Sequence, residues 1–281
     1  MTEDSYVEAV ERLGRGGTPV VSNDVALSAS RLADALAGFP GTVARGEEAL
    51  QRFDEELDAL VAPAVALVGV GPDEGLRTVS IALDTLAGAA GGTPRAHTHM
   101  AMAVLARAAL ALTAGALAWN RLEAVARLAS VVRSDGYGPA VSVLADANLR
   151  HLDVFGCAAD DGFRAHVAWY SRRRWRASVG PLSTDGQVEL AFAEADVLTG
   201  MLAVGTGRDR DLYAAGLRVS ERRVEDRLLA RAANPRQRPL LRELFGVTED
   251  NLDARLSDAY AGLTAGGSMT SFRRSLHRTE G

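Results

Sequence analysis

The sequence predicts an all-α fold, either a multi-helix bundle or an irregular solenoid-like stack of about ten helices in one or two lobes. The chain of 281 residues holds about 50 alanines but a single isoleucine, Ile81, and all 31 of its basic residues are arginine. Alanine, leucine and arginine lose little side-chain freedom in a helix, whereas β-branched residues lose more. Apolar residues also recur at helical spacing, and no segment alternates apolar and polar residues as a half-buried strand does.

The first half of the chain contains six predicted helices. They span residues 5–13, from a cap at Ser22–Asp24 to about 38, about 47–61, 72–90, 94–120 and 121–133. A glycine-rich linker, 14–22, separates the first two. The third helix has an apolar stripe and an acidic outer face formed by Glu47, Glu48, Asp54, Glu55 and Asp58. The fifth is long and almost uncharged, so we expect it to be the buried centre of the fold rather than a membrane span. Its lone Arg107 should pair with an acid or extend to solvent.

The second half adds six more predicted helices. They span residues 139–150, 161–176, 187–203, 209–232, 237–245 and 249–263, with a loop or short hairpin arm at 177–186. Residues 1–140 hold 17 acids against 11 arginines, whereas residues 141–281 hold 19 against 20. This asymmetry favours a division into a short helix and linker (1–22), an acidic helical lobe (23–138), a second helical lobe (139–264) and a flexible tail (265–281).

Several classes of site are excluded by residues that are missing or badly spaced. Without lysine the chain cannot form a phosphate-binding P-loop or a Schiff base. Residues Gly69–Gly75 lack dinucleotide-loop spacing, and Asp73 with Glu74 would repel a phosphate, so an acidic helix start is expected there. His97 and His99 lie two apart and would point to nearly opposite sides of a helix, which disfavours a shared metal. We therefore expect neither a cofactor nor a metal.

Localisation follows from the single cysteine, Cys157, which cannot form an internal disulfide. The N-terminus is acidic and has no apolar core of a signal peptide. These features predict a cytoplasmic protein.

The stretch 163–176 is the most distinctive candidate surface, because it gathers tryptophan and arginine, the residues enriched at binding hot spots. Its candidate binding residues are His166, Trp169, Arg172, Arg173 and Arg176. On a helix, three of these share one face, where arginine over tryptophan forms a cation–π contact. Alternatively, the aromatics pack inward and the arginines pair with acids of the first half. The acidic face of residues 47–58 is the next candidate.

These observations predict a helical binding protein, such as an adaptor, regulator or subunit, that acts through a protein partner or an anionic ligand. The alternative is an all-α enzyme whose site is assembled from Asp, Glu, His and Arg on separate helices. A second alternative is a nucleic-acid-associated regulator that uses 163–176, although the net charge of −5 disfavours extended nucleic-acid contact. The sequence indicates no membrane partner and leaves an oligomer open.

Overall fold

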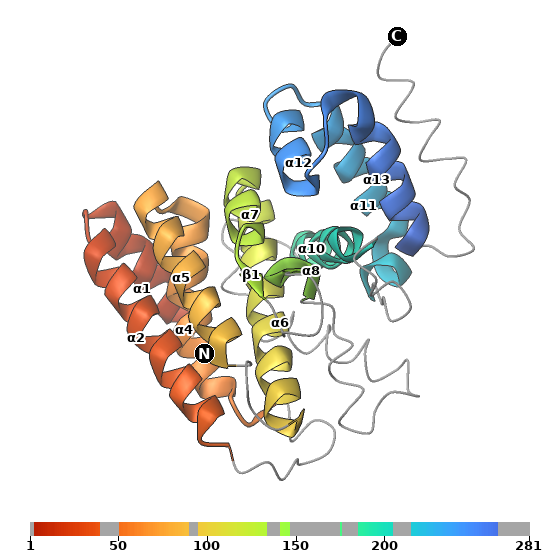
Figure 1. The fold of residues 1–281 in the computed structure, drawn as a ribbon. Coiled ribbons are helices and arrows are strands. Elements are labelled where there is room, and N and C mark those ends of the chain that lie inside the picture. The colour runs from red at the N-terminus through yellow and green to blue at the C-terminus, as the bar shows by residue number, and fades with distance from the viewer. Residues whose placement is uncertain are drawn as a thin grey trace.

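The computed structural model describes residues 3–39, 51–89, 95–133, 141–146, 175, 185–204 and 215–263. Within these ranges the chain forms eleven helices and one two-residue antiparallel strand pair, so the prediction of an all-α fold is confirmed (Figure 1). The helices are α1 (Glu3–Gly14), α2 (Thr18–Ala37), α4 (Asp54–Val70), α5 (Asp73–Ala89), α6 (Arg95–Ala118), α7 (Leu122–Ala129), α8 (Val143–Asp146), α10 (Asp185–Ala203), α11 (Ala215–Ala233), α12 (Arg238–Phe245) and α13 (Glu249–Leu263).

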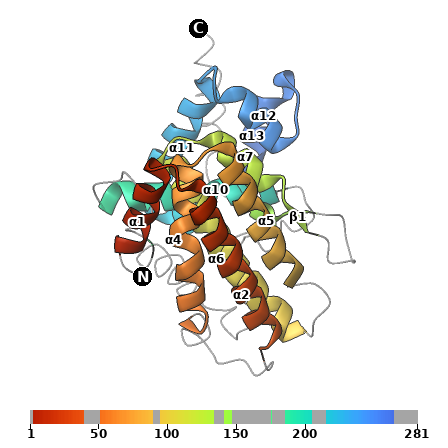
Figure 2. The ribbon, with the colours of Figure 1, turned by 90° about the vertical axis from the view of Figure 1, so that its left-hand side faces the viewer.

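The helices are arranged in successive layers around α6. Helix α2 packs against α4 and α5, and these in turn contact α6, whose opposite side contacts α10. Helices α11 and α13 pack on α10, so the C-terminal helices lie at the far end of the molecule from α1 and α2 (Figure 1). Figure 2 faces the α1–α2 side, where α1 lies beside α4. The candidate functional site lies among helices α1, α2 and α4.

Helix α6 is the centre of the fold, as its nearly uncharged sequence predicts. Its stretch Met100–Ala118 is long and apolar enough to cross a membrane, and residues 100–117 are all buried within the fold. Its leucines, including Leu112 and Leu117, contribute to a core shared with α4, α5 and α10. Arg107 is also buried, and its Nη2 donates to Asp54 Oδ1 at 2.8 Å, so the expectation that it pairs with an acid is confirmed.

Two helix boundaries in the first half differ from the sequence prediction. Helix α2 begins at Thr18 rather than at Ser22–Asp24, so part of the expected linker is helical. Pro19 lies in its first turn, where a missing N–H leaves no hydrogen bond unmade, and the Gly17 carbonyl accepts from the amide of Val21 at 3.1 Å. Helix α4 starts at Asp54 and continues to Val70 through Pro63, because packing against α2 and α6 outweighs the local effect of a proline.

The predicted helices at 121–133 and 139–150 are too long. Helix α7 ends at Ala129, and β1 (Val132–Arg133) pairs with β2 (Val141–Ser142) in an antiparallel register that places Val132 opposite Ser142. Helix α8 follows β2 directly. Backbone hydrogen bonds between these two segments, eight residues apart along the chain, therefore replace the helical bonds that local propensity favours.

The glycines of Gly69–Gly75 allow close packing of α4 against α5 and against Trp119, which follows α6. A Cβ on Gly69 would meet Trp119 Cδ1 at 2.5 Å, and one on Gly75 would meet Leu67 Cδ2 at 2.7 Å. Arg121 closes the turn from the other side, since its Nη1 donates to the Gly71 carbonyl at 2.6 Å. A guanidinium at a helix C-terminus complements the negative end of the helix dipole. As predicted, α5 begins with acidic residues.

Candidate functional site

The surface predicted from 163–176 is described at a single residue, Trp175. The five predicted surface residues, His166, Trp169, Arg172, Arg173 and Arg176, lie outside the described residues. Trp175 is fully buried. It packs inward, as the alternative interpretation of this stretch expects of its aromatics.

Trp175 belongs to a buried cluster of charged side chains from α4 and α6. Its indole Nε1 donates to Asp58 Oδ1 at 3.0 Å, and the guanidinium carbon of Arg107 lies 5.1 Å from the centre of its ring. The same Arg107 donates to Asp54, so one guanidinium makes both a charged hydrogen bond and a cation–π contact. The cluster joins the start of α4 to the middle of α6. The hydrogen bond from Trp175 in this cluster therefore holds the side chain of Asp58 in place on α4.

An open groove of about 540 Å³ lies on the other side of Asp58. We call it the α1–α2–α4 groove, because it is lined by residues within 5–12 of α1, 21–31 of α2 and 55–63 of α4. On each helix the lining positions recur every three or four residues, so each contributes one face. At a rise of 1.5 Å per residue, the α2 wall is about 15 Å long. Asp58 is thus shared between the groove and the buried cluster.

The walls of the groove are polar and predominantly acidic. Six charged residues line it: Glu8, Arg12, Asp24, Arg31, Glu55 and Asp58. The guanidinium of Arg12 makes ion pairs within the protein, with Glu8 at 2.5 Å and with Asp24 at 3.2 Å. Within the described part of the chain, no ion pair reaches Glu55 or Arg31. The lining therefore holds four carboxylates against two guanidinium groups, and Glu55 on α4 is one carboxylate that no ion pair reaches among the described residues.

Between the charged side chains the groove has apolar surface. It also has one further hydrogen-bond acceptor, a backbone carbonyl of α4. Val21 and Ala9 are buried, whereas Leu27 is 46% exposed. Pro63 in the interior of α4 has no N–H to donate to the carbonyl of Ala59, four residues earlier. Both residues line the groove. The α4 wall therefore offers a backbone carbonyl that lacks its usual intrahelical donor, close in sequence to Glu55 and Asp58.

A second hollow, between α5 and α7, is less suited to a ligand. It is lined by Asp73, Glu74, Leu76, Arg77, Glu123 and Arg127. Its acids and arginines nearly balance, and Leu76 is its single apolar side chain. Specific sites usually combine apolar surface with a few placed polar groups. Leu76 is itself buried, so this hollow offers little apolar side chain beyond the stems of its arginines.

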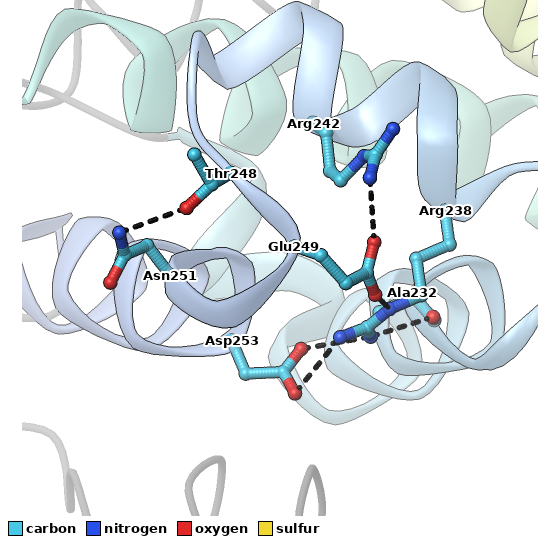
Figure 3. Close-up of polar contacts among 7 residues, drawn as sticks. All are labelled: Ala232, Arg238, Arg242, Thr248, Glu249, Asn251 and Asp253. Atoms are coloured by element: carbon cyan, nitrogen blue, oxygen red, sulfur yellow. Dashed lines mark hydrogen bonds and ion pairs between the residues drawn. The ribbon is translucent and has the colours of Figure 1, made fainter.

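Helices α12 and α13 carry a further charged cluster, drawn in Figure 3. Arg238 donates to Asp253 Oδ1 at 2.9 Å and to Glu249, and Arg242 pairs with Glu249 at 3.1 Å. These contacts raise the pKa of Arg238, and the hydrogen bond from Arg238 lowers the pKa of the Glu249 carboxyl. The four charges satisfy one another, so the cluster ties the two helices together.

The same helix pair bears on nucleic-acid binding. A three-residue turn joins α12 to α13, with Gly246 at a φ of 62°. Helix-turn-helix proteins use such a turn and read bases with the first residues of the second helix. In α13 these residues include Glu249, Asp250 and Asp253, whose charges oppose phosphate. This helix pair therefore gives no support to the nucleic-acid alternative.

A buried polar network holds the C-terminal helices to the end of α6. Arg231 of α11 pairs with Glu194 of α10, which is completely buried, and its Nη1 donates to Asn120 Oδ1 at 2.8 Å. Asn120 has a φ of 57°, which asparagine tolerates better than most residues, and it also accepts from Gln237 Nε2 at 2.7 Å. Because its members bond to one another, we assign this network to the stability of the fold.

Sequence reasoning anticipated the cluster only in part. A single arginine in an apolar helix signalled a buried ion pair, and the acidic face of 47–58 included both Glu55 and Asp58. The groove itself was missed, because its walls come from three helices and no local pattern marks their junction. Among the residues that the structure describes, no three His, Cys, Asp or Glu side chains are grouped so that they could hold a metal ion.

Comparison of the chain with protein-family models, with curated proteins and with solved structures finds no match.

Proposed function

We propose that this chain is a binding protein that holds a segment of a partner protein in the α1–α2–α4 groove. The observation that carries the proposal is the groove itself: about 540 Å³, with an acidic wall on α4 and apolar surface on α2. Apolar contact combined with a few placed charges is the usual composition of a specific interaction site. The buried cluster behind Asp58 supports this function, because it holds one wall rigid.

A binding role fits the groove better than catalysis. Its charged side chains Glu8, Arg31 and Glu55 are exposed to solvent. Enzyme sites strengthen their electrostatic interactions by excluding water, which an open groove does not do. The groove also disfavours an anionic ligand, because its four carboxylates outnumber its two guanidinium groups.

The test is a selection of peptides from a random phage-displayed library on the purified protein, followed by binding measurements on two variants. Ala59→Trp fills the groove from α4, whereas Ala254→Trp makes the same change at an exposed position of α13 at the far end of the molecule. We expect selected peptides to bind Ala254→Trp as they bind the wild type and to bind Ala59→Trp at least about tenfold more weakly. Circular dichroism and melting curves of both variants check that each is folded.

If no selected peptide distinguishes the two variants, the groove is not the binding site. If the selected peptides bind Ala254→Trp more weakly but bind Ala59→Trp as they bind the wild type, the interaction lies on the C-terminal helices.

A further inference from the structure

Resting on the proposed function, we infer that the segment held in the α1–α2–α4 groove carries charges of both signs, with an acidic side chain against Arg31 of α2 and a basic side chain against Glu55 of α4. Both residues line the groove, and they come from different helices. The occupant is therefore neither a purely basic nor a purely acidic segment.

Three of the charges that line the groove are engaged with one another. Arg12 of α1 pairs with Glu8 on the same helix at 2.5 Å and with Asp24 of α2 at 3.2 Å. Arg31 and Glu55 are both exposed, and neither makes an ion pair with any residue that the structure describes. A partner can therefore pair with these two side chains without first breaking an ion pair within the protein.

Two arginines lie near the start of α4, and both are directed away from Glu55. The guanidinium carbon of Arg52, three residues before Glu55, lies 4.6 Å from the centre of the Phe39 ring. Arg107 of α6 reaches the same turn of α4 but donates to Asp54, the residue next to Glu55. The carboxylate of Glu55 is thus left facing solvent, where a cation of a partner can reach it.

Arg31 has no local role on α2 that would explain its charge. It lies before the last turn of a helix that ends at Ala37, so it does not complement the helix dipole. Asp34, three residues later, is exposed and forms no ion pair with it. Leu27, one turn earlier on the same face, is 46% exposed. The α2 wall therefore offers an apolar side chain and an unpaired cation next to each other.

A segment of a single sign would meet one of these two charges with a like charge. A purely basic segment would place a cation against Arg31, and a purely acidic one would place a carboxylate against Glu55, and like charges in contact reject a partner. An uncharged segment would remove water from both groups without replacing it by a charged partner. A segment with an acid toward α2 and a base toward α4 avoids both costs.

The experiment uses the phage-selected peptides whose binding is weakened by Ala59→Trp. We expect each of them to contain at least one acid and at least one arginine or lysine. The tightest peptide is labelled with fluorescein, and its affinity is measured by fluorescence anisotropy. Replacing its critical acid by the amide should weaken binding to the wild type at least about threefold but leave binding to Arg31→Gln unchanged, because the charge that it pairs with is already gone. Replacing its critical base by a neutral residue should behave in the same way toward Glu55→Gln.

An exchange of the two charges supplies the sharper test. In Arg31→Glu/Glu55→Arg, which has the net charge of the wild type, the selected peptide should bind at least about tenfold more weakly, because two attractive pairs become two repulsive ones. A peptide with its own acid and base exchanged should bind this variant more tightly than the wild type. The matched control is Glu74→Arg/Arg77→Glu, since both residues are exposed on α5 outside the groove and Glu74, like Glu55, is the second residue of its helix. Binding to the control should stay within about twofold of the wild type. Circular dichroism checks that both double variants are folded.

Three results overturn the inference. The first is that the peptides lost on Ala59→Trp lack one of the two signs, and the second is that the charge-exchanged peptide still prefers the wild type. The third is an equal loss in the two double variants, because binding would then not depend on where the charges lie. In each of these cases the peptides still depend on Ala59, so the proposed function stands and the charge assignment alone is refuted. If no selected peptide depends on Ala59, the proposed function fails and the inference fails with it.

Discussion

Replacing Arg107 by methionine tests whether the buried ion pair between α4 and α6 stabilises the fold. The arginine side chain is 1% exposed, and Asp54, its partner at 2.8 Å, is 7% exposed, so the carboxylate left behind cannot be solvated without disturbing the core. Removing one member of such a pair costs about 3–5 kcal/mol. The cation–π contact with Trp175 is lost as well. For a chain of this size, the loss corresponds to a decrease in Tm of about 6–20 °C.

The assay is urea unfolding followed by circular dichroism at 222 nm, together with thermal melts, of three variants. Arg77→Met is the control, because Arg77 is exposed on α5 and its loss should change the free energy of unfolding by less than about 0.5 kcal/mol. The double variant Arg107→Met/Asp54→Leu removes both charges and should recover most of the lost stability, because an apolar pair of similar volume often replaces a buried ion pair without loss.

Two results would refute this reasoning. If Arg107→Met melts within about 2 °C of Arg77→Met, the buried pair contributes nothing to stability. If the double variant is less stable than Arg107→Met alone, the loss of Arg107 as a partner of the Asp54 carboxylate is not the cause of the lower stability.

Two further predictions concern packing and pH. Gly69→Ala should lower the free energy of unfolding by about 1–3 kcal/mol, because the new methyl would overlap Trp119 Cδ1. Gly88→Ala in α5 has open space around it and should raise stability by about 0.5–1 kcal/mol, and equal effects in urea melts would contradict the packing of the turn. Because Arg238 lowers the pKa of Glu249, their pair stabilises the fold above the ordinary glutamate pKa of about 4.3 and stops doing so as pH falls through the lower folded value. The Tm difference between the wild type and Glu249→Gln should therefore be present at pH 7 and shrink as the pH falls below the ordinary glutamate pKa of about 4.3, and a constant difference would contradict it.

The sequence by itself determined the fold class, the central position of α6, and the bounds of α12 and α13. Helix propensity and apolar periodicity are local properties, so they are readable in any helix whose ends are marked by capping residues, as α12 is by Gly246. The burial of α6 was readable for the same reason, since a helix that is apolar all round must be covered on every side. Because α6 is buried, its Arg107 needs an acidic partner or a path to solvent whatever the position of the helix in the fold.

Only the tertiary structure decided which residues meet. Asp54, 53 positions from Arg107, is one of several acids at the start of α4, and the crossing of α4 and α6 selects it. Tertiary packing also decided that α4 continues through Pro63 and that the β1–β2 pair forms where the sequence predicts helix. Burial and long-range hydrogen bonds outweigh local helix preferences, which amount to a few tenths to about 1 kcal/mol per residue. The α1–α2–α4 groove arises in the same way, because three helix faces far apart in sequence form it when α1 and α2 pack on α4.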